Sequence, residues 1–164
     1  MQEIPRMDMN IEIGEERFDR NLNDDLVIDQ NNLDQCLEQQ AALYAYYAIR
    51  YQQVQTLRDQ AEFDYDRIMN EANNVVREEL TGSSAKVTEK TVSALVESRT
   101  EVLAAKRLFL KYASQRDQMY SLVRALEHKK DCVLAIAYKK RQEFELMQSS
   151  VIMKSKIPKS GIEE

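Results

Sequence analysis

Residues 37–75 read LEQQAALYAYYAIRYQQVQTLRDQAEFDYDRIMNEANNV, and apolar or aromatic side chains recur along them in a three-four pattern. Two columns with a seven-residue period hold Leu37, Tyr44, Tyr51, Arg58, Tyr65 and Ala72, and Gln40, Tyr47, Val54, Ala61, Ile68 and Val75. A pattern sustained over about six heptads is typical of a helix that packs along a supercoiled seam. We therefore predict one long helix, which cannot bury its apolar stripe alone.

Turn-forming residues are rare in the interior of the chain. Pro5 and Pro158 lie near opposite ends, and Gly82 is the only glycine between Gly14 and Gly161. Glycine and proline supply backbone angles that other residues adopt at a cost, so a fold with many turns needs more of them. The chain is therefore expected to form long helices with few turns, and strands are not expected.

The segment Thr81-Gly82-Ser83-Ser84 predicts the end of the first helix, with a hinge over residues 81–87 and Thr88 or a nearby serine capping the next helix. Apolar residues at helical spacing follow: Val92, Leu95, Val102, Phe109, Ala113, Val123, Leu126, Val133, Ile136, Phe144 and Met147. Because these positions drift between heptad columns, we expect a bend or break near residues 115–130.

The domain organisation follows from these elements. Residues 1–25 are polar and acidic and are predicted to be a flexible tail; residues 149–164 are predicted to be a second one. Residues 26–148 are predicted to form the hairpin, whose first helix begins after Asp29. The expected fold class is all-α, a long coiled-coil-like helical hairpin.

A hairpin this thin exposes more apolar surface than one partner helix covers, which predicts self-association into a closed helical ring or bundle. The predicted oligomer interface consists of Leu37, Tyr44, Tyr47, Tyr51, Tyr65 and Ile68.

Charge is distributed unevenly. Residues 1–90 carry 9 basic and 19 acidic side chains, a net charge of −10, whereas residues 91–164 carry 14 and 9, a net charge of +5. This split fits an acidic tail with a basic working face, and it equally fits attraction between the two halves or between neighbouring subunits.

Enzymatic chemistry is not expected. The chain has one histidine, His128, and it has neither a glycine-rich phosphate loop nor a nucleophile elbow. His128 and Cys132 lie four residues apart, but a zinc site needs three or four ligands, and Cys36 is the only other cysteine. We predict no metal and no cofactor, an exposed histidine and a buried cysteine. No apolar run approaches the ~20 residues that cross a bilayer, so an intracellular protein that does not enter a membrane is expected.

Basic residues are the candidate working groups, because exposed cations repeated around an oligomer bind a phosphate backbone with little sequence preference. The predicted nucleic-acid-binding residues are Arg77, Lys86, Lys90, Lys106, Arg107, Lys111, Lys139, Lys140 and Arg141. Tyr46 lies outside both heptad columns and is the tyrosine expected to be free to stack on an unpaired base.

Several segments resemble a known family. They are Asp25-Leu26-Val27-Ile28-Asp29 followed by Leu33, then Leu43-Tyr44 and Tyr47, Lys86-Val87-Thr88-Glu89-Lys90-Thr91-Val92, Glu101-Val102, and Arg124-Ala125-Leu126 with Lys129-Lys130. In order and spacing, over roughly residues 25–145, they resemble the UvsY-like recombination mediators of phages. The resemblance implies a homo-oligomeric ring in the cytoplasm of an infected bacterial host. Such a ring binds single-stranded DNA and helps to load a RecA-like recombinase onto DNA coated by single-strand-binding protein.

One departure from the family concerns the end of the first helix, where the family carries a basic stretch followed by tyrosines. Here Arg77 is the one counterpart, and Glu78 and Glu79 beside it repel phosphate. Either the DNA contacts have moved to Lys86, Lys90 and the second helix, or this chain binds DNA weakly. The alternative function is a phage structural or assembly chaperone or scaffold that acts through protein–protein contacts alone.

Overall fold

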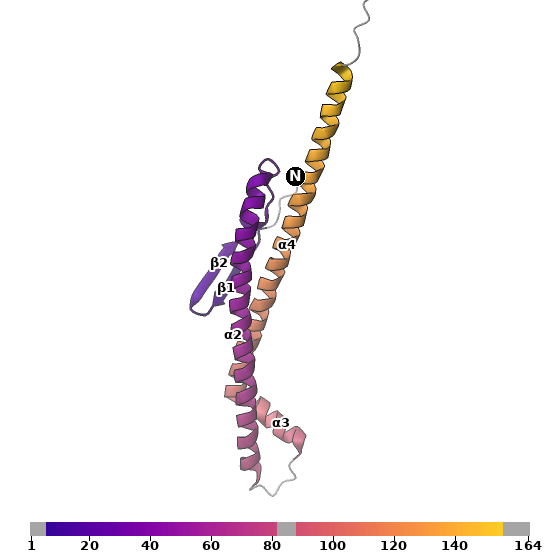
Figure 1. Ribbon diagram of the computed structural model, residues 1–164. Coiled ribbons are helices and arrows are strands. Elements are labelled where there is room, and N and C mark those ends of the chain that lie inside the picture. The colour runs from indigo at the N-terminus through magenta and orange to yellow at the C-terminus, as the bar shows by residue number, and fades with distance from the viewer. Residues whose placement is uncertain (1–5, 82–87, 156–164) are drawn as a thin grey trace, which may run out of the picture.

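The computed structural model describes residues 6–81 and 88–155, with side chains as far as residue 150. Its elements in chain order are β1 (Asp8–Ile13), β2 (Glu16–Asn21), α1 (Leu22–Leu26), α2 (Leu33–Thr81), α3 (Glu89–Glu97) and α4 (Thr100–Ser155). The long helices α2 and α4 lie side by side as an antiparallel hairpin, and the short elements pack against them (Figure 1). The predicted helical hairpin is confirmed, although a small sheet accompanies it.

The helix α2 is uninterrupted because no glycine or proline occurs within it and because charged side chains pair along its surface. Arg58 pairs with Glu62 at 2.7 Å and Arg67 pairs with Glu71 at 3.1 Å, both at the (i, i+4) spacing that supports a helix. Its start differs from the prediction. Asp29 forms a turn by accepting from the backbone N–H of Asn31 at 2.9 Å, and the helix begins at Leu33.

The seam between α2 and α4 forms the main core. On α2 the buried positions Gln40, Tyr47, Val54 and Ala61 recur every seven residues, as the sequence pattern predicts. On α4 the buried positions include two heptad columns: Gln115, Leu122 and Lys129, and Met119, Leu126 and Val133. Burying an apolar side chain of this size contributes about 1.5–3 kcal/mol, so this seam is the main source of hairpin stability.

The prediction of a flexible tail over residues 1–25 is wrong for the part of it that the structure describes. Met9, Ile11 and Ile13 alternate with polar residues, and that two-residue period places all three on the buried face of β1. Gly14 has a φ of +63° at the first central position of the turn to β2, where a tight hairpin favours glycine. The register pairs Ile11 with Phe18, which is also buried.

The elements β1, β2 and α1 form an N-terminal unit. Buried polar groups fix this N-terminal unit to α2 and α4. Asp25, at the end of α1, accepts a short hydrogen bond from the Tyr47 hydroxyl and pairs with Arg20 at 3.1 Å. The buried Lys129 ammonium of α4 donates to the Asp25 carbonyl at 2.9 Å. Burial, followed by the hydrogen bond to Asp25, raises the pKa of Tyr47 well above its usual value, so the hydroxyl remains a donor at any physiological pH.

A second buried contact holds the outer edge of β1 against α4. The side-chain amide of Gln115 lies flat against Glu12; its nitrogen donates to the Glu12 carbonyl at 3.0 Å and its oxygen accepts from the Glu12 N–H at 3.2 Å. The amide thereby substitutes for a neighbouring strand. This satisfies backbone groups that an edge strand otherwise leaves open.

A smaller core lies at the other end of the hairpin. Ala72 and Val76 of α2 pack there against Val92 and Val96 of α3 and Val102 of α4. Thr88 caps α3 as predicted, by accepting from the Thr91 N–H at 3.3 Å. Of the predicted hinge, residues 82–87 lie outside the described part of the chain.

The predicted break in the second helix is misplaced. It occurs at Ser98 and Arg99, between α3 and α4, and α4 then continues through residues 115–130 without interruption. The backbone N–H of Ser98 returns to the Ala94 carbonyl at 3.2 Å, and Arg99 pairs with Glu79 of α2 at 2.5 Å. The bend lets Val96 and Val102 face the same core.

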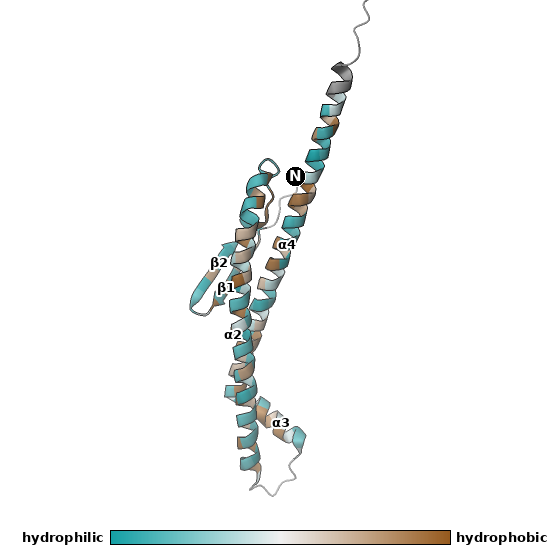
Figure 2. Cartoon of the chain, viewed as in Figure 1, coloured by the Kyte–Doolittle hydropathy of each residue, from teal (hydrophilic) through white to brown (hydrophobic). Residues whose placement is uncertain are grey.

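The C-terminal part of α4 projects beyond the rest of the molecule (Figure 1). It remains helical through residues 149–155, where a flexible tail is predicted, and residues 156–164 lie outside the described chain. Every side chain from Tyr138 to residue 150 is exposed, and the projecting end mixes polar and apolar positions (Figure 2).

Within the described ranges, no helix combines the length and apolarity that crossing a membrane requires.

The Tyr47 hydroxyl provides a test of how the N-terminal unit is attached. Tyr47→Phe leaves the buried Asp25 carboxylate without one of its two side-chain donors and is expected to lower the free energy of unfolding by about 1–3 kcal/mol. Urea denaturation of the full chain measures this. The matched control is Tyr120→Phe, at a half-exposed tyrosine, and it is expected to change stability by less than ~0.5 kcal/mol. Equal effects from the two variants contradict the assignment.

Candidate functional site

The basic residues predicted to bind nucleic acid are distributed along the molecule. Arg77 lies on α2 and Lys90 on α3, and the others that the structure describes, Lys106, Arg107, Lys111, Lys139, Lys140 and Arg141, lie on α4. Lys86 lies outside the described residues. From Arg107 to Lys139, α4 rises about 48 Å at ~1.5 Å per residue. One subunit therefore does not bring these cations into a single patch.

Half of the eight described cations are paired with acids, and one more contacts a backbone carbonyl. Arg77 pairs with Glu89 at 2.6 Å. Arg141 pairs with Glu145 at 3.0 Å, and Lys139 lies 3.8 Å from Glu143. The Lys140 ammonium donates to the Gln30 carbonyl. A phosphate that binds here has to compete with a carboxylate or a carbonyl already in place.

Lys111 is tied to a residue 99 positions away in the chain. Its ammonium donates to the Glu12 carboxylate of β1, and this hydrogen bond lowers the pKa of Glu12 and raises that of Lys111. The pair lies beside the Gln115 contact to the same strand. Lys111 therefore serves to dock the N-terminal unit.

Three of the predicted cations differ from the rest. Lys90, Lys106 and Arg107 are exposed and form no ion pair with another described residue. Lys106 and Arg107 are adjacent on α4, near the second core, and project into solvent with their full charge. They are the best-placed groups in the described chain for an anionic polymer.

Tyr46, predicted to be free, is part of an aromatic and arginine cluster. Its ring lies 5.2 Å from that of Tyr47, and the guanidinium carbons of Arg20 and Arg50 lie 5.4 and 5.6 Å from its centroid. Arg50 is in turn paired with Glu16 at 2.7 Å. Cation–π contacts thus connect β2 to α2. The sequence did not indicate this cluster, because Arg20 lies in the segment predicted to be a tail.

The residues predicted to form an oligomer interface divide into two groups. Tyr47 is completely buried within the chain, and Tyr51, Tyr65 and Ile68 pack against the two cores, with Tyr65 stacked on Phe109. These four contribute to the fold of one subunit. Leu37 and Tyr44 lie on the surface, where they line a groove.

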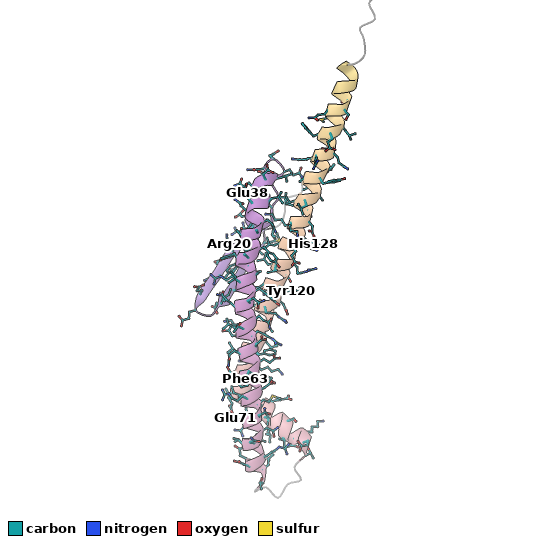
Figure 3. The ribbon with its side chains drawn as sticks, viewed as in Figure 1. Arg20, Glu38, Phe63, Glu71, Tyr120 and His128 are labelled. Atoms are coloured by element: carbon teal, nitrogen blue, oxygen red, sulfur yellow. The ribbon has the colours of Figure 1, made fainter. Side chains whose placement is uncertain are left out.

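This groove runs along the α2–α4 seam on the side opposite the β-hairpin. Two adjoining hollows of about 640 and 700 Å³ compose it, and Tyr44 and Glu127 line both. Apolar residues line its length: Leu37, Ala41, Tyr44, Ala48, Ile49 and Tyr51 from α2, and Tyr120, Val123 and Leu134 from α4. Figure 3 shows Tyr120 and His128 on the part of α4 that runs beside α2.

One polar atom beside the groove has no partner. The Gln40 side chain is only 5% exposed; its nitrogen donates to the Leu126 carbonyl at 2.6 Å. Its oxygen, Oε1, is buried and accepts no hydrogen bond from the described chain. A buried acceptor without a donor costs about 1–3 kcal/mol of stability.

The predicted chemistry around the histidine is partly corrected. His128 is exposed as expected, but Cys132 is exposed too, because its position on α4 faces away from the seam. The other cysteine, Cys36, contacts the Asp29 carbonyl at 3.9 Å through its Sγ. In the described part of the chain, no three His, Cys, Asp or Glu side chains converge as metal ligands.

Comparisons with protein-family models, with curated proteins and with solved structures find no match to this chain.

The contact of Lys111 with Glu12 predicts a titration result. Because this hydrogen bond lowers the pKa of Glu12, Lys111→Gln is expected to raise it toward the ordinary glutamate value. A carboxyl whose folded pKa is depressed stabilises the fold above its unfolded pKa, and this contribution is lost as pH falls through the folded pKa. NMR titration of the Glu12 carboxyl measures the shift, with Lys106→Gln as the matched control. An unchanged Glu12 pKa in Lys111→Gln contradicts the contact.

Proposed function

We propose that the protein is a non-catalytic recombination mediator that acts in the cytoplasm of an infected bacterium. It binds single-stranded DNA as a homo-oligomer and helps to load a RecA-like recombinase onto DNA coated by single-strand-binding protein. The resemblance of residues 25–145 to UvsY-like mediators supports this role. The observation that carries the DNA-binding part is that Lys106 and Arg107, adjacent on α4, are exposed and form no ion pair with any residue that the structure describes.

The ion pairs support a DNA contact at Lys106 and Arg107 rather than at the projecting end of α4. Exposed ion pairs are worth only about 0.2–1 kcal/mol each, so Glu143 and Glu145 weaken phosphate binding at Lys139 and Arg141 without abolishing it. Lys106 and Arg107 carry no such penalty. Lys90, on α3, adds a third exposed cation near the same end of the hairpin.

Self-association is part of this proposal because two or three cations on one subunit give only weak binding. Each phosphate contact releases roughly 0.7 counterions from a single strand, and affinity grows with the number of contacts. A ring that repeats the Lys106–Arg107 pair presents many contacts to one strand and gains avidity without any new chemistry.

A second function, an assembly chaperone or scaffold that acts through protein contacts alone, is favoured by a different observation. The apolar side chains Leu134, Tyr138, Phe144, Leu146 and Met147 of α4 are each 49–71% exposed. Large exposed apolar surfaces mark protein interfaces. On the same end of α4, Lys139 and Arg141 are already paired with Glu143 and Glu145. Cations that are already paired suit a contact with a protein better than a contact with DNA.

Fluorescence anisotropy of a labelled oligothymidylate distinguishes the two functions. Lys106→Gln/Arg107→Gln is expected to weaken binding about tenfold at low salt. It is also expected to make the slope of log K against log salt shallower by about 1.4 for each engaged subunit. The matched control Lys139→Gln/Arg141→Gln removes two paired cations and is expected to keep the affinity within about twofold.

Equal losses in the two variants contradict the assigned contact. If the unmodified protein does not bind at low salt, the mediator proposal is overturned, and the assembly function takes its place.

A further inference from the structure

The face of α4 that packs on α2 continues beyond Leu33, the N-terminal end of α2. Met119, Leu126 and Val133 face α2 at heptad spacing, and the same column reaches Lys140 and Met147. Phe144 lies three residues before Met147, on the same side of the helix. The contact of Lys140 with Gln30 marks the end of the covered part, because the chain before α2 turns away toward α1.

The uncovered part is long and apolar enough to need a partner. Phe144, Leu146 and Met147 are 61%, 71% and 67% exposed. From Tyr138 to Ser155 the helix extends about 26 Å at ~1.5 Å per residue. A helix of this length gains most of its stability from packing an apolar face rather than from its own propensity.

The groove beside the seam matches the projecting end of α4 in its length and in the side-chain pattern of one wall. Leu37, Ala41, Tyr44 and Ala48 are spaced four, three and four residues apart, so large and small side chains alternate along one wall. Such an alternation accepts the side chains of a third helix as knobs into holes. From Leu37 to Thr56 the groove extends about 28 Å along α2, close to the length of the projecting end.

We propose that the groove of one subunit binds the projecting end of α4, residues 138–155, from a second copy of this chain. Phe144 and Met147 of the incoming helix pack against the alanine and tyrosine wall. This inference rests on the self-association in the proposed function and is independent of where DNA binds.

The contact is head-to-tail, which distinguishes it from the simplest alternative. Two projecting ends that pair with each other bury Phe144 and Met147 but leave the groove uncovered. Placing the end of one subunit in the groove of the next covers both surfaces with one interface. Repetition of such a contact closes into a ring or continues as a filament.

Complementation between two variants tests this geometry. Ala41→Arg fills the groove and leaves the projecting end intact; Phe144→Asp/Met147→Asp disables the end and leaves the groove intact. All three positions are exposed in the subunit, so the fold is expected to survive, as far-UV circular dichroism checks. Each variant alone is expected to sediment as the 19.2 kDa chain. Their mixture retains one intact interface and is expected to form a heterodimer of twice that mass.

Leu110→Asp is the matched control, since Leu110 is 53% exposed on α4 but lies outside the groove, and it is expected to assemble as the unmodified chain does. Assembly of Ala41→Arg at the unmodified level, or a mixture that remains monomeric, overturns the head-to-tail contact. A monomeric unmodified chain overturns it as well. Anisotropy reads DNA binding separately, so failure of the head-to-tail contact in a chain that still self-associates leaves the mediator function standing, whereas a monomeric unmodified chain also removes the self-association on which that function depends.

Discussion

The packing of α2 against α4 along one heptad seam is the constraint on which the rest of the molecule depends. Tyr47 and Val54 on one helix and Met119 and Leu126 on the other are almost completely buried, and their positions fix how both helices are rotated. With the rotation fixed, Tyr46 and Arg50 face the β-hairpin on one side of the seam, while Tyr44 and Ala48 line a groove on the other. Both surfaces follow from the same interface.

The seam also explains which part of α4 is left uncovered. At about 1.5 Å per residue, the 49 residues of α2 extend about 74 Å and the 56 residues of α4 about 84 Å. The bend before α4 and the turn before α2 shift the helices further relative to each other. The apolar face of α4 therefore extends beyond the N-terminal end of α2. In the proposed contact a second copy covers this face, and the groove that binds it is built from the same two helices.

Buried polar groups make the attachment of the N-terminal unit specific. Asp25, Gln115 and Lys129 are each about 8% exposed, and each meets a defined partner on another element. An apolar contact alone allows a small hairpin to slide along a smooth helical groove. A displaced hairpin leaves these polar groups buried without partners, and that penalty favours one position.

How far the sequence predicts the structure depends on how far apart along the chain the interacting residues lie. The seven-residue repeat through Tyr47 and Val54 identifies α2 and its buried face, because that information is local. The β-hairpin is not predicted, although Met9, Ile11 and Ile13 alternate before Gly14, because the many acidic residues of this segment are typical of a tail and the two-residue period is short. The break at Ser98 carries no glycine or proline, and the partner of Lys111 lies 99 residues away at Glu12. Neither is visible in a pattern of neighbouring residues.

Hydrogen exchange of the full chain, followed by mass spectrometry across a range of protein concentrations, separates the part of α4 that α2 covers from the part that the proposed second copy covers. Peptides covering residues 119–133 are expected to be protected at every concentration, because α2 covers them within one subunit. Peptides covering residues 141–150 are expected to be protected at high concentration and to lose that protection on dilution. If residues 141–150 exchange at the rate of an unfolded peptide at all concentrations, the projecting end of α4 has no partner in a second copy, which contradicts the proposed contact.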